Sequence, residues 1–445
     1  METILIKAAQ LILSLSILVV LHEFGHFMFA RLFNTRVEKF YLFFNPWFSL
    51  FKFKKGETEY GVGWLPLGGY VKISGMIDES MDKEAMKLPP QPYEFRAKPA
   101  WQRLLIMVGG VMMNFIFALA IYVGVLYVWG EQYLPTKNAT HGIVVTEAGE
   151  DIGLRTGDKI LTVDNQYIEN FHKIIPTVVL NDARTIQVER DGQVVDVNIS
   201  SDDMSKLLKS KSVIAPRVLF KMQIEGFTAD SPGEKAGLMT GDRIVKLNGN
   251  EITYYDEWSN ELSDLKGDPI TLTVERNGQL VDVDMVLGED GMIGIRMNQF
   301  TENYLQLETI NYGFFESIPA GIARGFEITK DYLKQFKLLF RPETKAYESL
   351  GGFATIGNIF PGTWDWFSFW NMTAFISIIL AIMNLLPIPA LDGGHVMFLF
   401  FEMISGRKPG EKFLEYAQIA GMLLLLALVI YANANDIIKM INGTF

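Results

Sequence analysis

The chain has 445 residues, of which 49% are hydrophobic and 20% are charged, and its mean hydropathy of +0.17 is high for a protein with so many charges. Membrane spans that alternate with water-facing domains would give both values. The net charge of −11 argues against nucleic acid as a partner. The chain has no cysteine, which excludes disulfides and a thiol nucleophile.

The first apolar stretch contains the sequence VLHEFGHF at residues 20–27. His22 and His26 are four residues apart, so on a helix they lie on one face and can hold one Zn²⁺. Glu23 can then reach a water on the metal as a general base. The alternative is a helix that only packs these side chains. Ionisable groups in an apolar segment are costly, however, and are usually kept for a function.

Four stretches are long and apolar enough to span a membrane as helices. The first could instead be a signal peptide, but it lacks a basic cluster at its start and a small-residue cleavage site. We therefore expect a polytopic α-helical membrane protein. Its four transmembrane helices are predicted within residues 1–33, 103–131, 364–395 and 413–436.

The loop between the first two predicted spans indicates the orientation of the chain. Residues 31–103 hold 12 Lys and Arg residues, many close to the spans, which places this loop in the cytoplasm. The HExxH sequence then lies near the cytoplasmic end of the first span. The second span leads outside and the third returns, so Asp392 also lies near a cytoplasmic end. Two polar motifs that are far apart in the sequence are thus expected at the same depth in the membrane.

A β-hairpin is predicted within the loop of residues 34–102. Residues 58–64 alternate between apolar and polar, 65–69 form a turn, and 70–74 return. Because this hairpin is apolar, we expect it to enter the membrane beside the site, where non-helical backbone needs protein or water around it. A cytoplasmic hairpin without contact to the site is the alternative. A strand of substrate would pair with Tyr70, Val71, Lys72, Ile73 and Ser74.

Two stretches between the second and third spans are repeated. GLRTGDKI at residues 153–160 recurs as GLMTGDRI at 237–244. TIQVERDGQVVDVNI at 185–199 recurs as TLTVERNGQLVDVDM at 271–285. Each longer repeat predicts two strands joined by an Asp-Gly or Asn-Gly hairpin turn.

The repeats predict two similar small β-rich domains, at residues 138–220 and 221–300. Their glycine-rich pattern resembles that of PDZ domains, which bind extended peptides by strand addition. A role as spacers is the alternative. Residues 301–363 follow as an amphipathic helix and linker. The helix, at about 314–340, would lie at the membrane surface, although a helix packed on a globular domain would look the same.

The third span ends in the sequence NLLPIPALDGGH, residues 384–395, where two prolines interrupt the helix. A catalytic zinc needs three protein ligands and an open position. We choose Asp392 as the third ligand, with His395 as a rival and Glu402 as a weaker one. The alternative for Asp392 is an N-cap of a short helix. Gly393 and Gly394 would allow close backbone approach, and residues 396–412 are expected to form a cytoplasmic loop.

Two asparagines in the spans have two interpretations each. Asn384 could donate hydrogen bonds to the substrate backbone or to an oxyanion, and Asn114 could belong to the site. A hydrogen bond between helices is the alternative for both. Near Asn114, the Gly109-Gly110 pair permits close approach of another helix.

Together these motifs resemble the site-2 protease family of intramembrane zinc metalloproteases, in particular its bacterial RseP type. The resemblance is carried by HEFGH, by PLGGYVKISGM at residues 66–76, by the tandem repeats and by NLLPIPALDGGH. It implies that His22, His26 and Asp392 bind zinc and that Glu23 is the catalytic acid and base. It also implies that Asn384 handles substrate and that the hairpin is the family's membrane-associated β-loop.

The resemblance further implies regulated intramembrane proteolysis in the bacterial cytoplasmic membrane. Substrates would be single-span membrane proteins, such as anti-sigma factors or signal-peptide remnants, already cut by a first protease. The PDZ pair would exclude intact ectodomains. One departure is Phe353 in residues 349–353, where the family is expected to have a small-residue Gly-Pro motif, so the local geometry there is not carried over.

Two other classes of protein remain as alternatives. The first is a non-catalytic membrane scaffold that presents PDZ domains. The second is a metal transporter with histidines on an ion path, which predicts polar residues at mid-depth in several spans. Here the polar residues of the spans cluster at one end.

Overall fold

The computed structural model describes residues 2–66, 68–76, 89–210, 212–220, 223–288, 290–297, 305–341 and 350–442. Leu67 of the expected turn and Ser349 of the segment before the third span lie outside these residues. The chain forms two units, which we describe separately. One contains residues 1–130, 311–333 and 350–445, and the other contains 131–310 and 334–349.

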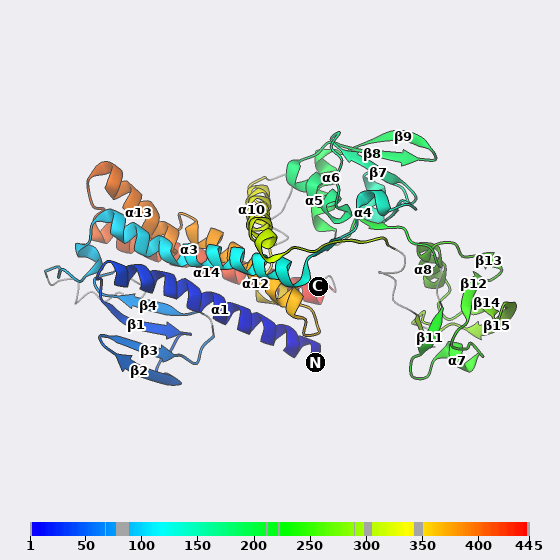
Figure 1. The fold of residues 1–445 in the computed structure, drawn as a ribbon, viewed down its shortest axis with the longest axis horizontal. Helices are drawn as coiled ribbons and strands as arrows, with labels where there is room; N and C mark the ends of the chain where they lie inside the picture. Colours follow the sequence, from blue (N-terminus) through cyan, green and yellow to red (C-terminus); the bar gives the residue numbers. More distant parts are fainter. Residues whose placement is uncertain are drawn as a thin grey trace. The chain divides into compact units, whose positions relative to one another are not determined.

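Among the described residues, four helices of the first unit are long and apolar enough to cross a membrane, as the sequence predicts. α3 packs along both α1 and α12, and the three helices lie side by side in Figure 1. The first two helices cross closely, because a Cβ on Gly25 of α1 would lie 2.1 Å from the carbonyl oxygen of Gly109. The helices are α1 (Glu2–Leu32), α3 (Ala100–Trp129), α12 (Trp366–Leu385) and α14 (Glu411–Ile441).

The third span is interrupted at the expected place. α12 ends at Leu385, residues 386–391 are not helical, and α13 (Asp392–Ser405) follows. The prediction of a loop from residue 396 is therefore wrong for its first ten residues. The apolar side chains there form a helical face, and Val396 and Leu399 are buried in one cluster with Ile106 and Met107 of α3.

A four-stranded sheet packs against α1 in the first unit (Figure 1). Its order is β2-β3-β1-β4, so β4 is an edge strand. The predicted pairing of residues 58–64 with 70–74 is wrong, because β1 lies between them and pairs in parallel with β3 and antiparallel with β4. β1 holds this central place because it buries Val37 and Tyr41. The strands are β1 (Val37–Leu42), β2 (Phe51–Lys55), β3 (Thr58–Val62) and β4 (Tyr70–Ile73), and η1 (Phe95–Ala97) precedes α3.

The second unit contains two β-rich modules, each with its own buried apolar cluster. A short pair of strands, β5 (Glu131–Tyr133) and β17 (Glu308–Ile310), joins the two ends of this part of the chain. The first module contains η2 (Thr136–Asn138), β6 (Ile143–Val145), α4 (Glu147–Asp151), β7 (Lys159–Val163), η3 (Phe171–Lys173), α5 (Ile174–Asn181), β8 (Thr185–Arg190), β9 (Gln193–Asn198), α6 (Ser201–Lys209) and β10 (Ile214–Pro216). The second contains β11 (Ile224–Phe227), α7 (Pro232–Lys235), β12 (Arg243–Leu247), β13 (Asn250–Glu251), α8 (Tyr255–Asp264), β14 (Pro269–Arg276), β15 (Gln279–Val286) and β16 (Ile295–Met297).

The sequence repeat corresponds to a repeated structure. In the first module Arg190 donates to buried Asp158 at 2.8 and 2.7 Å, and in the second Arg276 donates to Asp242 at the same two distances. Burial alone would raise the pKa of Asp242, but the Arg276 guanidinium and a backbone N–H hold it below its usual value. The two predicted hairpin turns are also present, with positive φ at both central residues of each turn.

Two further described helices begin in the first unit. The predicted amphipathic segment contains α10 (Phe314–Leu338), which exposes Phe315 and Phe326. The same helix also packs on α3, because a Cβ on Gly321 would lie 2.5 Å from the backbone nitrogen of Val123. α11 (Phe353–Asn358) begins at Phe353, in the segment where the resemblance leads us to expect a small-residue motif.

Candidate metal site

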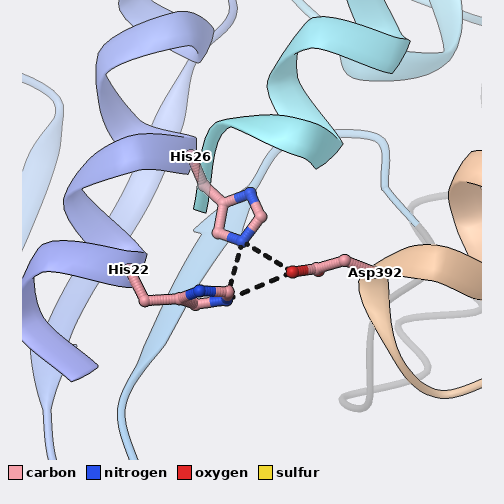
Figure 2. Close-up of side chains that lie close together, drawn as sticks. All are labelled: His22, His26 and Asp392. Carbon is pink, nitrogen blue, oxygen red and sulfur yellow. Dashed lines mark hydrogen bonds and ion pairs between the residues drawn. The ribbon is translucent and has the colours of Figure 1, made fainter. Parts of the chain in front are cut away.

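Three side chains from two distant parts of the sequence meet at one point in the first unit (Figure 2). His22 Nε2 lies 3.2 Å from His26 Nε2. Asp392 Oδ2 lies 3.1 Å from His22 Nε2 and 3.3 Å from His26 Nε2. Helix α1 supplies both histidines, and the first residue of α13 supplies the carboxylate. The structure thus brings together the three residues that the sequence analysis selected as metal ligands.

The interrupted third span places Asp392 in this position. The segment folds back tightly at the start of α13, where a Cβ on Gly393 would lie 2.1 Å from the carbonyl oxygen of Leu386. Asp392 is the first helical residue and Leu391 is the N-cap, with no side-chain capping bond. The alternative of Asp392 as an N-cap is therefore wrong, and its carboxylate faces the histidines instead.

The spacing of the three donor atoms is typical of ligands around a metal rather than of hydrogen-bonded partners. Asp392 Oδ2 is buried and receives no well-aligned hydrogen bond from the described residues, although both Nε2 atoms are within 3.3 Å. In a tetrahedral zinc site with metal–ligand distances of about 2.0–2.1 Å, neighbouring donor atoms are about 3.3 Å apart. Two imidazoles and one carboxylate at this spacing match the ligand set of a catalytic zinc.

The cluster lies in the wall of a cavity of about 540 Å³. Glu23 and Asn384 line the same cavity, as do four consecutive residues of the edge strand β4, residues 70–73. Burial raises the pKa of Tyr70 to about 12, and its hydroxyl donates to Asn45 at 2.9 Å. Ser74, expected to contact substrate, is not among the described lining residues. It is buried and donates to Glu38 at 2.8 Å.

The structure separates the rival ligands from the cluster. His395 lines the cavity but does not belong to the described group of three donor residues. Glu402 accepts a hydrogen bond from Arg103, and the two side chains are only 13% and 9% exposed. Arg103 therefore neutralises the charge of Glu402, and their ion pair holds α13 against the start of α3.

Among the described residues of the cavity wall, sequence reasoning missed two that are polar. Lys39 comes from β1, a strand that was not predicted. Gln418 comes from α14, where the signal was an amide side chain within a predicted span.

Comparison with known proteins agrees with this geometry. A family model described as peptidase family M50 matches residues 10–428. The chain is 27% identical to the regulator of sigma E protease of Haemophilus influenzae, with 96% of this chain and 98% of the relative covered. It is 29% identical to a "putative zinc metalloprotease" of Neisseria meningitidis, covering 97% and 98% of the two chains.

A third relative is the regulator of sigma-E protease RseP of Salmonella typhimurium, which is 28% identical over 98% of this chain and 99% of its own. The family match spans nearly the whole chain, including both segments that form the cluster. The chain therefore belongs to peptidase family M50, the site-2 protease family, and is a membrane-spanning metalloprotease.

Proposed function

We propose that this protein is a zinc-dependent intramembrane endopeptidase in which His22, His26 and Asp392 hold the metal. The observation that carries the proposal is the convergence of their three donor atoms at 3.1–3.3 Å. When bound, zinc supplies a Lewis acid that polarises a peptide carbonyl and lowers the pKa of a coordinated water. The names of the relatives in Neisseria meningitidis and Vibrio cholerae support zinc as the metal.

Two further residues of the cavity complete the proposed chemistry. Glu23 follows a ligand directly in the sequence and lines the cavity, so it would take the proton of the attacking water. It would then deliver that proton to the leaving amine nitrogen. Asn384 lines the cavity with an amide, which would donate hydrogen bonds to the substrate backbone or to the developing oxyanion.

The substrate must reach the cavity as an extended segment, because the amides of a transmembrane helix are hydrogen-bonded and inaccessible. The edge position of β4 supports strand addition as the way in which this segment is held. Residues 70–73 line the cavity along this strand, so a paired substrate strand would run past the metal ligands.

We also propose an orientation of the chain in the membrane and a role for its two β-rich modules. Residues 34–102 would face the cytoplasm, and the modules at 138–220 and 221–300 would lie outside as PDZ domains that exclude large ectodomains. Substrates would be single-span membrane proteins, already shortened by a first protease. Anti-sigma factors are favoured because the relatives in Haemophilus influenzae and Salmonella typhimurium are named as regulators of sigma E. Signal-peptide remnants would meet the same size limit.

The test compares wild type with Glu23→Gln on a truncated single-span substrate in membranes. We expect wild type to give a cleaved product, and Glu23→Gln to keep zinc but give none, because the amide cannot accept the proton. Product formation by Glu23→Gln would contradict the assigned role. Wild-type protein that binds no zinc would favour the scaffold. Zinc binding without cleavage by wild type would favour the transporter.

A further inference from the structure

One face of α3 contacts both histidine rings of the cluster. Ile106, Gly110 and Asn114 are spaced four residues apart, so they lie on one side of the helix. The carbonyl oxygen of Ile106 is 2.8 Å from His26 Nδ1. A Cβ on Gly110 would lie 2.5 Å from His26 Nε2 and 2.6 Å from His22 Cε1. The amide of Asn114 is 3.5 Å from His22 Nδ1.

The two rings have the same arrangement. Each directs Nε2 toward Asp392 and presents Nδ1 to α3. A neutral imidazole that binds a metal through Nε2 carries its proton on Nδ1, so Nδ1 becomes a donor that needs an acceptor. For His26 that acceptor is the carbonyl oxygen of Ile106. For His22 the polar group in this position is the side chain of Asn114.

The Asn114 amide can supply this acceptor. Its oxygen, Oδ1, is buried without a hydrogen-bond partner among the described residues, whereas Nδ2 is the atom near the ring. A half-turn about the last side-chain bond exchanges the two atoms. Oδ1 then faces the Nδ1–H of His22, and the buried oxygen gains its partner. The backbone at this position is also held, because Ser377 donates to the carbonyl oxygen of Asn114 at 2.7 Å.

We propose that Asn114 is a positioning residue whose side-chain carbonyl accepts the Nδ1–H of His22 and fixes that ring for metal binding. This inference rests on the proposed role of His22 as a ligand. It goes further by assigning α3, which supplies no ligand itself, as the element that orients both histidines. Loss of such an outer hydrogen bond weakens metal affinity about 10–100-fold in comparable sites.

The experiment measures zinc affinity of the purified full-length protein by competition with a chelator. Asn114→Leu keeps the approximate size but removes the acceptor, so we expect about 10–100-fold weaker zinc binding. Asn114→Asp keeps an acceptor oxygen and should restore affinity close to wild type. The Co²⁺-loaded protein gives a second readout, because its visible spectrum should change in Asn114→Leu and not in Asn114→Asp.

Asn371→Leu is the matched control, since it removes a buried amide from α12 that bonds to Arg324 and not to the cluster. Its zinc affinity should equal that of wild type. Should Asn114→Leu fail to fold, Asn114→Ala replaces it, because it is smaller and also lacks the acceptor. The inference is overturned if the variant without an acceptor binds zinc as wild type does, or if Asn114→Asp fails to restore binding. If His22→Ala binds zinc as tightly as wild type, the proposed function itself fails.

Discussion

At the scale of single residues, the site depends on close approach between α3 and the histidine rings. Gly110 has no side chain, and any Cβ there would come within 2.8 Å of three ring atoms of His22 and His26. The rings cannot move away without leaving Asp392, to which both direct Nε2. Residue 110 must therefore be glycine because there is no room for a side chain, and not because its backbone has a conformation that only glycine adopts.

We therefore predict that Gly110→Ala weakens zinc binding at least about tenfold, the effect of about 1.4 kcal/mol of lost binding free energy. Gly124→Ala is the matched control on the same helix, because a Cβ there meets no atom within 4 Å. Zinc titration of the two purified variants checks this prediction. Equal affinities for the two variants would show that the rings tolerate a methyl group at residue 110.

At the scale of elements, the edge strand β4 lines the cavity with four consecutive residues, 70–73, whereas Lys39 lines it from β1. Proline has no N–H, and successive N–H groups of a strand point to opposite sides. Proline at Val71 and at Lys72 therefore removes one N–H from the open edge and one from the pairing with β1.

Of these two variants, we predict that the one whose proline removes the N–H of the open edge cleaves a membrane substrate about two- to tenfold more slowly, since each lost strand hydrogen bond is worth about 0.5–1.5 kcal/mol. It should keep its zinc, which separates this effect from damage to the ligands. Lys54→Pro is the control on β2, the opposite edge of the same sheet. Rates unchanged both in detergent and in membranes would refute strand addition.

The elements also show which parts of the fold can be read from the sequence. The four spans and the hairpin turns at residues 191–192 and 277–278 were predictable, because an apolar run and a turn dipeptide are local signals. The pairing of β3 and β4 was not, because β1 enters between them from a stretch whose alternation is short. The same limit applies to α13, whose apolar face is explained only by its packing on α3.

The candidate site also has residues that could be predicted from the sequence and residues that could not. His22 and His26 follow from one local spacing, and Asp392 follows from a polar residue at the end of an interrupted span. Lys39 and Gln418 could not be placed, because their contact with the cavity depends on how β1 and α14 pack. The sequence left two interpretations of Asn114 open, and only the contact with His22 Nδ1 favours the site.

At the scale of the whole molecule, the proposed orientation places the loop of residues 34–102 and the two modules on opposite sides of the membrane. The chain has no cysteine, so single introduced cysteines report accessibility without background. Lys54 and Gln193 are exposed positions in β2 and β9.

In intact cells, we predict that a maleimide unable to cross the membrane labels Gln193→Cys and not Lys54→Cys. Both should be labelled once the membrane is opened, which controls for reactivity. Labelling of Lys54→Cys alone in intact cells would reverse the orientation and place the metal ligands near the outer face.

We propose that one zinc joins the first span to the start of α13, although 365 residues lie between His26 and Asp392 in the sequence. Elemental analysis of purified full-length wild type and Asp392→Ala tests it most directly. We predict one zinc per wild-type chain and loss of most of it in Asp392→Ala, because two imidazoles alone hold the metal weakly. Wild type without zinc, or Asp392→Ala with the same zinc content as wild type, would contradict the account.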